Sequence, residues 1–186
     1  MGPGRASQLI PETPTAVTET SIRSADDPVI AWRYWQVAAG TTVLSSVTYK
    51  RWLWEPGQTL RAVCVGTGHA APAERCACGI HGSMDLTSLR DHGLCLAPAT
   101  PLVMGTVALW GKIVPDQRSW RGEFAYPTEL SVVRESVAEG ALAALLDGLA
   151  DYAVAVGTTA LEQAVGDISA AVLANQAMSA ATRLGH

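Results

Sequence analysis

The stretch Leu102-Val-Met-Gly-Thr-Val-Ala-Leu-Trp-Gly-Lys-Ile-Val114, continued by Pro115-Asp-Gln-Arg118 and Trp120-Arg-Gly-Glu-Phe-Ala-Tyr126, carries the strongest fold signal in this chain. It predicts two β-strands joined by a polar loop, because both runs are rich in β-branched and aromatic residues and the second alternates with a period of two. In the second strand the aromatic side chains share one face, and we expect Arg121 and Glu123 to pair on the other. The stretch therefore favours a largely antiparallel sheet.

Three runs upstream predict further strands of this sheet. Val29–Val37 is the clearest, since β-branched and aromatic residues fill it. Val43–Trp54 would place Trp52 and Trp54 on one face, and Thr59–Cys64 would lead directly into a loop rich in cysteine and histidine. Six tryptophans against a single phenylalanine indicate that tryptophan organises the core.

Helices are expected at three places. Ser83–His92 predicts a short helix with Ser83 as its N-cap. Residues 130–150 predict a longer helix that packs on the sheet, because apolar side chains recur there at helical spacing. After a short strand or extended linker at Tyr152–Val156, the sequence Thr159-Ala-Leu-Glu162 matches a capping box that opens a C-terminal helix.

Together these patterns predict an α+β fold. We expect a Trp-rich, mostly antiparallel sheet or small open barrel with a Cys/His loop, one packed helix and a C-terminal helix. Residues 28–157 would form the globular α+β domain, and residues 158–186 the C-terminal helix. Residues 1–27 are rich in Pro, Thr, Ser and acidic residues with few apolar anchors, so we expect a disordered tail.

Charge and hydropathy argue against two classes of partner. The formal net charge is −4 and only two lysines occur, whereas general nucleic-acid binding needs a basic excess. No apolar run approaches the roughly 20 residues that span a bilayer, so we expect no membrane insertion. The first residues lack the apolar segment of a secretory signal, which favours a cytoplasmic location. In a reducing compartment the four cysteines are expected as ligands, buried thiols or redox groups.

Three of these cysteines and two of the four histidines lie in the segment Cys64–His81, which is rich in glycine and proline. The ligand set that we favour is Cys64, His69, Cys76 and Cys78, with the spacing C-x4-H-x6-C-x-C. Three thiolates and one imidazole fill a tetrahedral zinc site without an open position, which is the pattern of structural zinc. The sequence therefore predicts a metal-binding loop with zinc as its cofactor.

Alternatives to this ligand set remain open at the level of sequence. An iron–sulfur cluster suits the same soft thiolate ligands, and without any metal Cys64 and Cys95 would be small buried hydrophobic residues. His81 would replace His69 as a ligand or donate a hydrogen bond from outside the ligand set. Cys76 and Cys78 would also serve as an oxidisable thiol pair.

The chain resembles a group of small bacterial proteins of unassigned function. The resemblance lies in the C-x4-H-x6-C-x-C-G-I loop, followed by Val107-Ala-Leu-Trp-Gly111 and Arg121-Gly-Glu-Phe-Ala-Tyr-Pro127, and spans roughly residues 30–156. Many members of the group carry an aromatic residue at the position of His81, which implies that His81 is not an essential ligand. The group has no established activity. The resemblance therefore indicates that these residues form one motif, but it implies no function.

These observations favour a non-enzymatic accessory or regulatory protein over an enzyme. Its Cys3His site would rigidify a loop, and a protein partner would bind that loop or the last helix, whose alanine-rich residues 160–182 also suit self-association. A thiol-based or iron–sulfur redox sensor is the first alternative, and a metal-dependent hydrolase or transferase is the second. We find no catalytic signature, because paired carboxylates and phosphate-binding glycine motifs are absent from the sequence.

Overall fold

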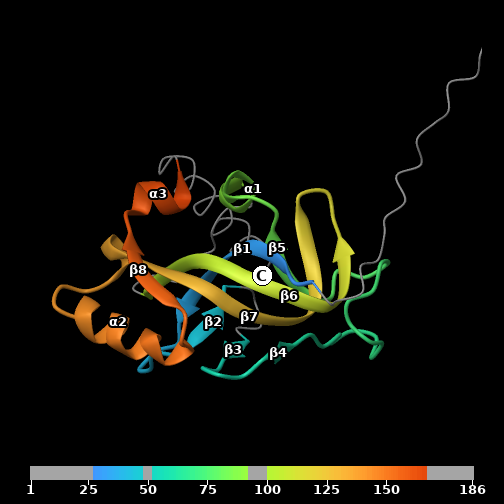
Figure 1. The fold of residues 1–186 in the computed structure, drawn as a ribbon, viewed down its shortest axis with the longest axis horizontal. Coiled ribbons are helices and arrows are strands. Elements are labelled where there is room, and N and C mark those ends of the chain that lie inside the picture. Colours follow the sequence, from blue (N-terminus) through green and yellow to red (C-terminus); the bar gives the residue numbers. More distant parts are fainter. Residues whose placement is uncertain (1–26, 48–51, 92–99, 167–186) are drawn as a thin grey trace, which may run out of the picture.

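A computed structural model describes residues 27–47, 52–91 and 100–166 of the chain (Figure 1). It is a mixed α+β structure in which strands predominate, and two 3-10 helices at Arg134–Ser136 and Ala150–Tyr152 flank one of the α-helices. The elements in chain order are β1 (Val29–Val37), β2 (Leu44–Ser46), β3 (Leu53–Trp54), β4 (Leu60–Arg61), β5 (Ile80–Ser83), α1 (Leu86–Asp91), β6 (Leu102–Pro115), β7 (Ser119–Val133), α2 (Leu142–Leu149), β8 (Ala155–Thr159) and α3 (Leu161–Val165).

The two strands predicted from the opening stretch, β6 and β7, form the main part of the sheet. β6 and β7 pair antiparallel along nearly their whole lengths, from Val103↔Val132 to Pro115↔Trp120. The register shifts twice, and Gly111 lies in the second irregularity with a φ of 76°, a conformation that favours glycine. Both strands expected in this stretch are present, and their pairing is the longest among the described residues.

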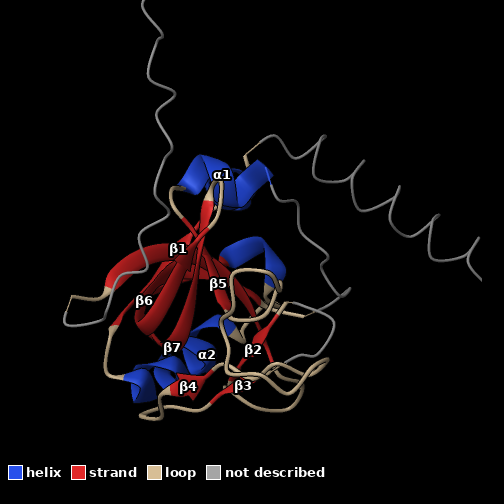
Figure 2. Ribbon diagram, turned by 90° about the vertical axis from the view of Figure 1, so that its right-hand side faces the viewer, coloured by secondary structure: helices blue, strands red, loops and turns tan. Residues whose placement is uncertain are grey.

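The remaining strands extend this hairpin into one sheet that is mostly antiparallel, which confirms the expected class. One path through the sheet runs β3-β2-β1-β5-β7-β4, while β6 pairs with both β1 and β7. β8 is parallel to β7. Of the two expected arrangements, sheet and small barrel, the described strands form a mostly antiparallel sheet and not a clear barrel. The pairings lead from β1 through β6 and β7 to β5, which returns to β1 only at the single residue pair Trp32↔Ser83. Figure 2 shows α1 and α2 at opposite ends of the sheet.

Tryptophan forms the centre of the main core, as expected, but the two tryptophans of the second predicted strand have different environments. Trp35 and Trp54 are buried and meet edge to face, with ring centroids 5.5 Å apart. Trp52 is 43% exposed. The single predicted strand Val43–Trp54 is wrong, because β2 and β3 instead pair antiparallel with Leu44 opposite Trp54.

The helix predicted over residues 130–150 is also shorter than expected. Residues 130–133 continue β7, because their backbone pairs with β6 on one side and β8 on the other. The helix α2 begins only at Leu142 and buries Leu145 and Leu149 against the main core. One helix therefore packs on the sheet as predicted, but sheet pairing overrides helical periodicity in the first part of the segment.

The N-cap of α1 is Asp85 rather than the predicted Ser83. The Asp85 carboxylate accepts a hydrogen bond from the backbone N–H of Ser88 over 2.7 Å. Ser83 is the last residue of β5 and pairs with Ser119. Because of its pairing with β7, strand β5 continues through the residue where the helix was expected to begin.

The described part of the last segment packs on the sheet. β8 spans the boundary expected between residues 157 and 158, and α3 has Ala160 as its N-cap, with the Gln163 side chain accepting from the Ala160 N–H. Tyr34 donates a hydrogen bond to the carbonyl of Ala164, which lies in a second buried cluster with Leu89 and Met104. The expected tail (1–26), most of the expected C-terminal helix (167–186) and Cys95 lie outside the described residues.

Candidate metal centre

The Cys/His loop connects two strands that both pair with β7. Leu60 and Arg61 of β4 pair with β7 at Ala125 and Phe124, and β5 pairs with it from Ile80↔Gly122 onward. The two ends of the loop are therefore held on neighbouring parts of one strand. This anchoring brings Cys64, just after β4, close to Cys78, just before β5.

The four predicted ligands come together. One ligand atom from each of Cys64, His69, Cys76 and Cys78 lies within 4.8 Å of all the others. The Sγ atoms of Cys64 and Cys76 are 3.9 Å apart, and Cys78 Sγ is 4.0 Å from both ring nitrogens of His69. Two thiolates on one tetrahedral zinc ion lie about 3.8 Å apart, given Zn–S bonds of about 2.3 Å. The group can hold a metal ion with little rearrangement.

The cysteines of this group are free thiols. The structure gives no disulfide to Cys64, Cys76 or Cys78. The 3.9 Å between the Cys64 and Cys76 sulfurs is nearly twice the length of about 2.05 Å that an S–S bond requires. Their spacing is that of ligands around a common centre.

Close packing at Gly79 fixes the end of the loop. Its φ is 125°, which L side chains rarely adopt, and a Cβ atom there would lie 2.9 Å from the Cβ of Pro72 and 3.0 Å from that of Arg121. The backbone after Cys78 can therefore pass between the loop and β7 only as glycine. This passage sets the approach of Cys78 to the other ligands.

Arg121 on β7 binds the backbone of the Cys/His loop through hydrogen bonds. Its buried guanidinium donates hydrogen bonds to three loop carbonyls, those of Ala73 (2.9 Å), Cys78 (3.1 Å) and Cys76. The predicted pairing of Arg121 with Glu123 is wrong, because Arg121 binds the backbone of the loop instead. Glu123 instead pairs with Arg61 over 3.4 Å.

Local hydrogen bonds favour ionisation at two of the thiols. The hydroxyl of Thr67, 3.3 Å from the sulfur, is the main cause that lowers the pKa of Cys64 to about 6. The backbone N–H of Cys78, followed by the His69 ring, lowers the pKa of Cys76. The thiolate form is the one that binds metal ions, so these contacts prepare two ligands for coordination.

The pKa values of the other two ligands, Cys78 and His69, are raised. Burial raises the pKa of the Cys78 thiol. The carbonyl of Ala70, which lies 3.0 Å from Nδ1, is the main cause that raises the pKa of His69. A metal ion would displace a proton from the Cys78 thiol, and the raised pKa of His69 makes protonation compete more strongly with metal binding at that ring.

His81 lies outside the four ligands. Its Nε2 donates a hydrogen bond to the carbonyl of Ala77 over 2.9 Å, so the ring supports the loop backbone between Cys76 and Cys78. The alternative in which His81 replaces His69 is therefore not the arrangement that the structure shows. The other expectation for His81 was a hydrogen bond from outside the ligand set. The structure shows such a bond, and its acceptor is the backbone carbonyl of Ala77.

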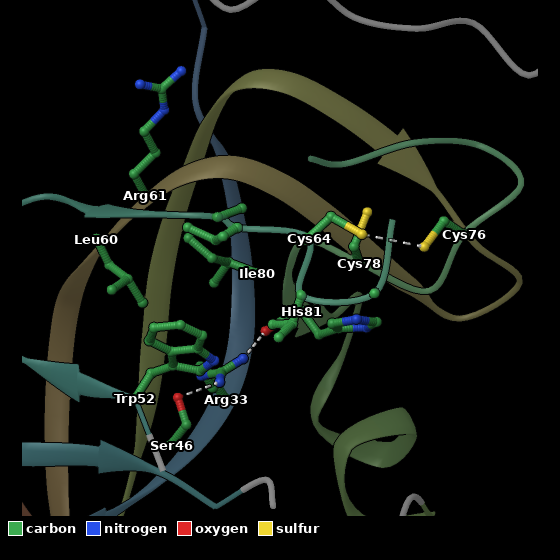
Figure 3. A pocket seen from close by; sticks show the side chains of 15 residues that line it. Arg33, Ser46, Trp52, Leu60, Arg61, Cys64, Cys76, Cys78, Ile80 and His81 are labelled. Atoms are coloured by element: carbon green, nitrogen blue, oxygen red, sulfur yellow. Dashed lines mark hydrogen bonds between the residues drawn. The ribbon is translucent and has the colours of Figure 1, made fainter. Parts of the chain in front are cut away.

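A cavity of about 430 Å³ opens beside the ligands (Figure 3). All three clustered cysteines line one end of it, and Arg33, Ser46 and Trp52 lie at the other. Arg33 on β1 and Arg121 on β7 also belong to the site, although neither was predicted as a site residue. The available signal was an arginine at an inward position within an otherwise apolar or aromatic strand run.

No protein-family model matches the chain, and searches of curated proteins and of solved structures found no significant match. Within the described ranges, no helix combines the length and the apolar character that crossing a membrane requires.

Proposed function

We propose that the loop binds one zinc ion through Cys64, His69, Cys76 and Cys78, and that the chain is a non-enzymatic accessory or regulatory protein. The convergence of the four ligand atoms within 4.8 Å carries this proposal. Four protein ligands complete a tetrahedron, so no position remains for water or substrate. A site of this kind stabilises a structure and does not perform chemistry on a bound molecule.

The compactness of the ligand group favours a single ion over an iron–sulfur cluster. A cluster places several iron and sulfide ions between its thiolates and holds the outer ligands farther apart than one ion does. All four ligand atoms lie within 4.8 Å of one another, which suits one tetrahedral centre. Zinc prefers this geometry and this mixture of sulfur and nitrogen ligands.

The proposed role of the metal is to rigidify a surface that a protein partner binds. Val63 and Val65, on either side of Cys64, are 59% and 58% exposed. Trp52 and Leu53, near the same cavity, are also exposed apolar side chains. Exposed apolar groups beside a metal-stapled loop support recognition of a partner through this part of the molecule.

Elemental analysis of anaerobically purified protein tests the metal. We expect about one zinc per chain, and Cys76→Ser or Cys78→Ser should lose it, because removing one of four ligands opens the site. Each substitution should also lower Tm by roughly 5 °C or more, since each kcal/mol of unfolding free energy changes Tm by about 2–4 °C in a chain of this size.

Two matched controls accompany these variants. Cys95→Ser removes a thiol that is not one of the four ligands, and His81→Asn removes an imidazole that bonds to the backbone. Both should keep stoichiometric zinc. Stoichiometric metal with unchanged Tm in the Cys76 and Cys78 variants would overturn the proposal.

One observation favours a thiol-based redox sensor as a second candidate. Cys64, with a pKa of about 6, faces Cys76 across 3.9 Å. A peroxide would take two electrons from these thiols, forming one disulfide and releasing two water molecules. Peroxide treatment of protein proven to contain zinc distinguishes the candidates: a sensor releases zinc and recovers it after reduction, whereas a structural site resists oxidation.

The cavity beside the cysteines is the observation that bears on a metal-dependent hydrolase or transferase. Such an enzyme needs an open coordination position. Substitution of cobalt for zinc tests this directly, because the visible spectrum of cobalt reports its coordination number. A four-coordinate spectrum that does not change when small anions are added supports the structural site.

A further inference from the structure

We propose that the cavity beside the Cys/His loop binds a small monocarboxylate, with the carboxylate at Arg33 and the apolar body of the ligand against Trp52. This ligand site is additional to the proposed zinc site. It rests on three observations: a cavity of suitable size, a buried cation whose charge is not offset, and exposed apolar walls.

The cavity has the dimensions of a small-molecule site. Its volume of about 430 Å³ falls in the range of roughly 300–1,000 Å³ that is typical of ligand pockets. It lies between β4 and Trp52, the residue just before β3, and these two strands are the ends of the path through the sheet. Strands β1 and β5 contribute Arg33 and Ile80 to its lining (Figure 3).

Arg33 is the polar group that defines the ligand. It is 9% exposed, and its guanidinium donates to the carbonyl of His81 and, over 3.1 Å, to the hydroxyl of Ser46. The same group lies over the ring of Trp54, 5.0 Å from its centroid. All of these partners are neutral.

The charge of Arg33 is not offset by any carboxylate in residues 27–47, 52–91 and 100–166, and its Nε has no hydrogen-bond partner there. Burial lowers the pKa of Arg33 to about 10, so the group stays protonated at neutral pH. A guanidinium has five N–H donors and the structure uses two. A buried charge is normally paired, and a carboxylate supplies the matching charge and geometry.

The walls define the rest of the ligand. Trp52 exposes 43% of its surface next to Arg33, and Leu60 and Ile80 also line the cavity. These side chains suit an aliphatic or aromatic body. The other arginine of the lining, Arg61, already pairs with Glu123. One free cation in an apolar cavity favours a singly charged ligand over a phosphate ester.

Binding of paired probes to the full chain as purified tests the proposal. The probes are acetate, hexanoate and phenylacetate, each compared with its neutral amide by ligand-observed NMR and by quenching of tryptophan fluorescence. We expect hexanoate or phenylacetate to bind about tenfold more tightly than its amide, because a charge-assisted hydrogen bond to guanidinium is lost. Acetate should bind more weakly than both, since it lacks the apolar body.

Variants locate the site. Trp52→Ala should weaken binding several-fold, whereas Leu53→Ala, a matched control for an exposed side chain outside the cavity lining, should not. Arg33→Lys should keep the preference for carboxylate over amide. Arg33→Gln should abolish it, with a cooperative thermal unfolding transition reporting that the fold is intact. Equal binding of acids and amides, no binding of any acid, or equal affinities in the Trp52 and Leu53 variants would each overturn the proposal.

Discussion

Arg121 is the side chain that links the sheet to the candidate metal centre. It reaches from β7 to three loop carbonyls, and no carboxylate of the described residues pairs with it. A zinc ion with three thiolates and one neutral imidazole carries a net charge of −1. The cation of Arg121 therefore both fixes the loop backbone and offsets the charge of the proposed centre.

At this scale we predict that Arg121→Gln weakens zinc binding by roughly 10- to 100-fold, which is the usual effect of losing a supporting group outside the ligand shell. Arg121→Lys should have an intermediate effect, because lysine keeps the charge but not the planar array of donors. Competition with a chromophoric chelator measures the affinity.

Arg118→Gln is the matched control for this prediction. Arg118 is an exposed arginine in the same hairpin and pairs with Asp91 over 2.7 Å, away from the loop carbonyls. The zinc affinity of the Arg118→Gln variant should equal that of the wild type. Equal affinities for the Arg121→Gln and wild-type chains would show that the loop does not depend on this contact.

At the scale of elements, the β6–β7 hairpin depends on close approach of two backbones. A Cβ atom at Gly105 would lie 1.8 Å from the carbonyl oxygen of Glu129, and backbone atoms cannot yield as a flexible side chain can. The register of the hairpin shifts next to this point, between Thr106 and Val107. Gly105 therefore lets the two longest strands meet where their pairing is irregular.

We accordingly predict that Gly105→Ala lowers the free energy of unfolding by about 3 kcal/mol or more, at the upper end of the cost of overpacking. Gly157→Ala on β8 is the matched control, because a Cβ there meets nothing within 4 Å, and its effect should stay within about 0.5 kcal/mol. Urea denaturation of both variants measures the difference. Similar midpoints for the two would contradict the prediction.

At the scale of the whole molecule, the core and the metal loop are largely separate sources of stability. The main buried cluster takes most of its residues from β1, β6, β7 and α2, and it includes both Trp35 and Trp54. Few loop residues are buried, Cys64 and Ala71 among them. The sheet thus has its own apolar core, while the loop depends on its ligands and on Arg121.

Removal of the metal should therefore affect one region more than the other. We predict that chelation increases amide hydrogen exchange across residues 62–79 by at least tenfold more than it does in the β6–β7 pairing, because local unfolding follows local contacts. Exchange followed by mass spectrometry resolves the two regions. A uniform loss of protection across the sheet would show that the metal holds the entire fold.

Local patterns in the sequence determined much of this molecule. Val29–Val37 and the two strands of the long hairpin follow from β-branched and aromatic runs, because strand formation there agrees with the tertiary structure. The spacing of Cys64, His69, Cys76 and Cys78 identified the four residues that converge. Ligand type and a short, flexible loop restrict such a set even without coordinates.

Only the tertiary structure decided the features that depend on contacts between distant segments. Residues 130–133 have a helical apolar pattern, yet they are strand because β6 and β8 flank them. Arg33 and Arg121 read as ordinary strand residues until folding buries them beside a cavity and a loop. Short-range order follows from each residue's own preferences, whereas the partner of a buried charge is set by which strands become neighbours.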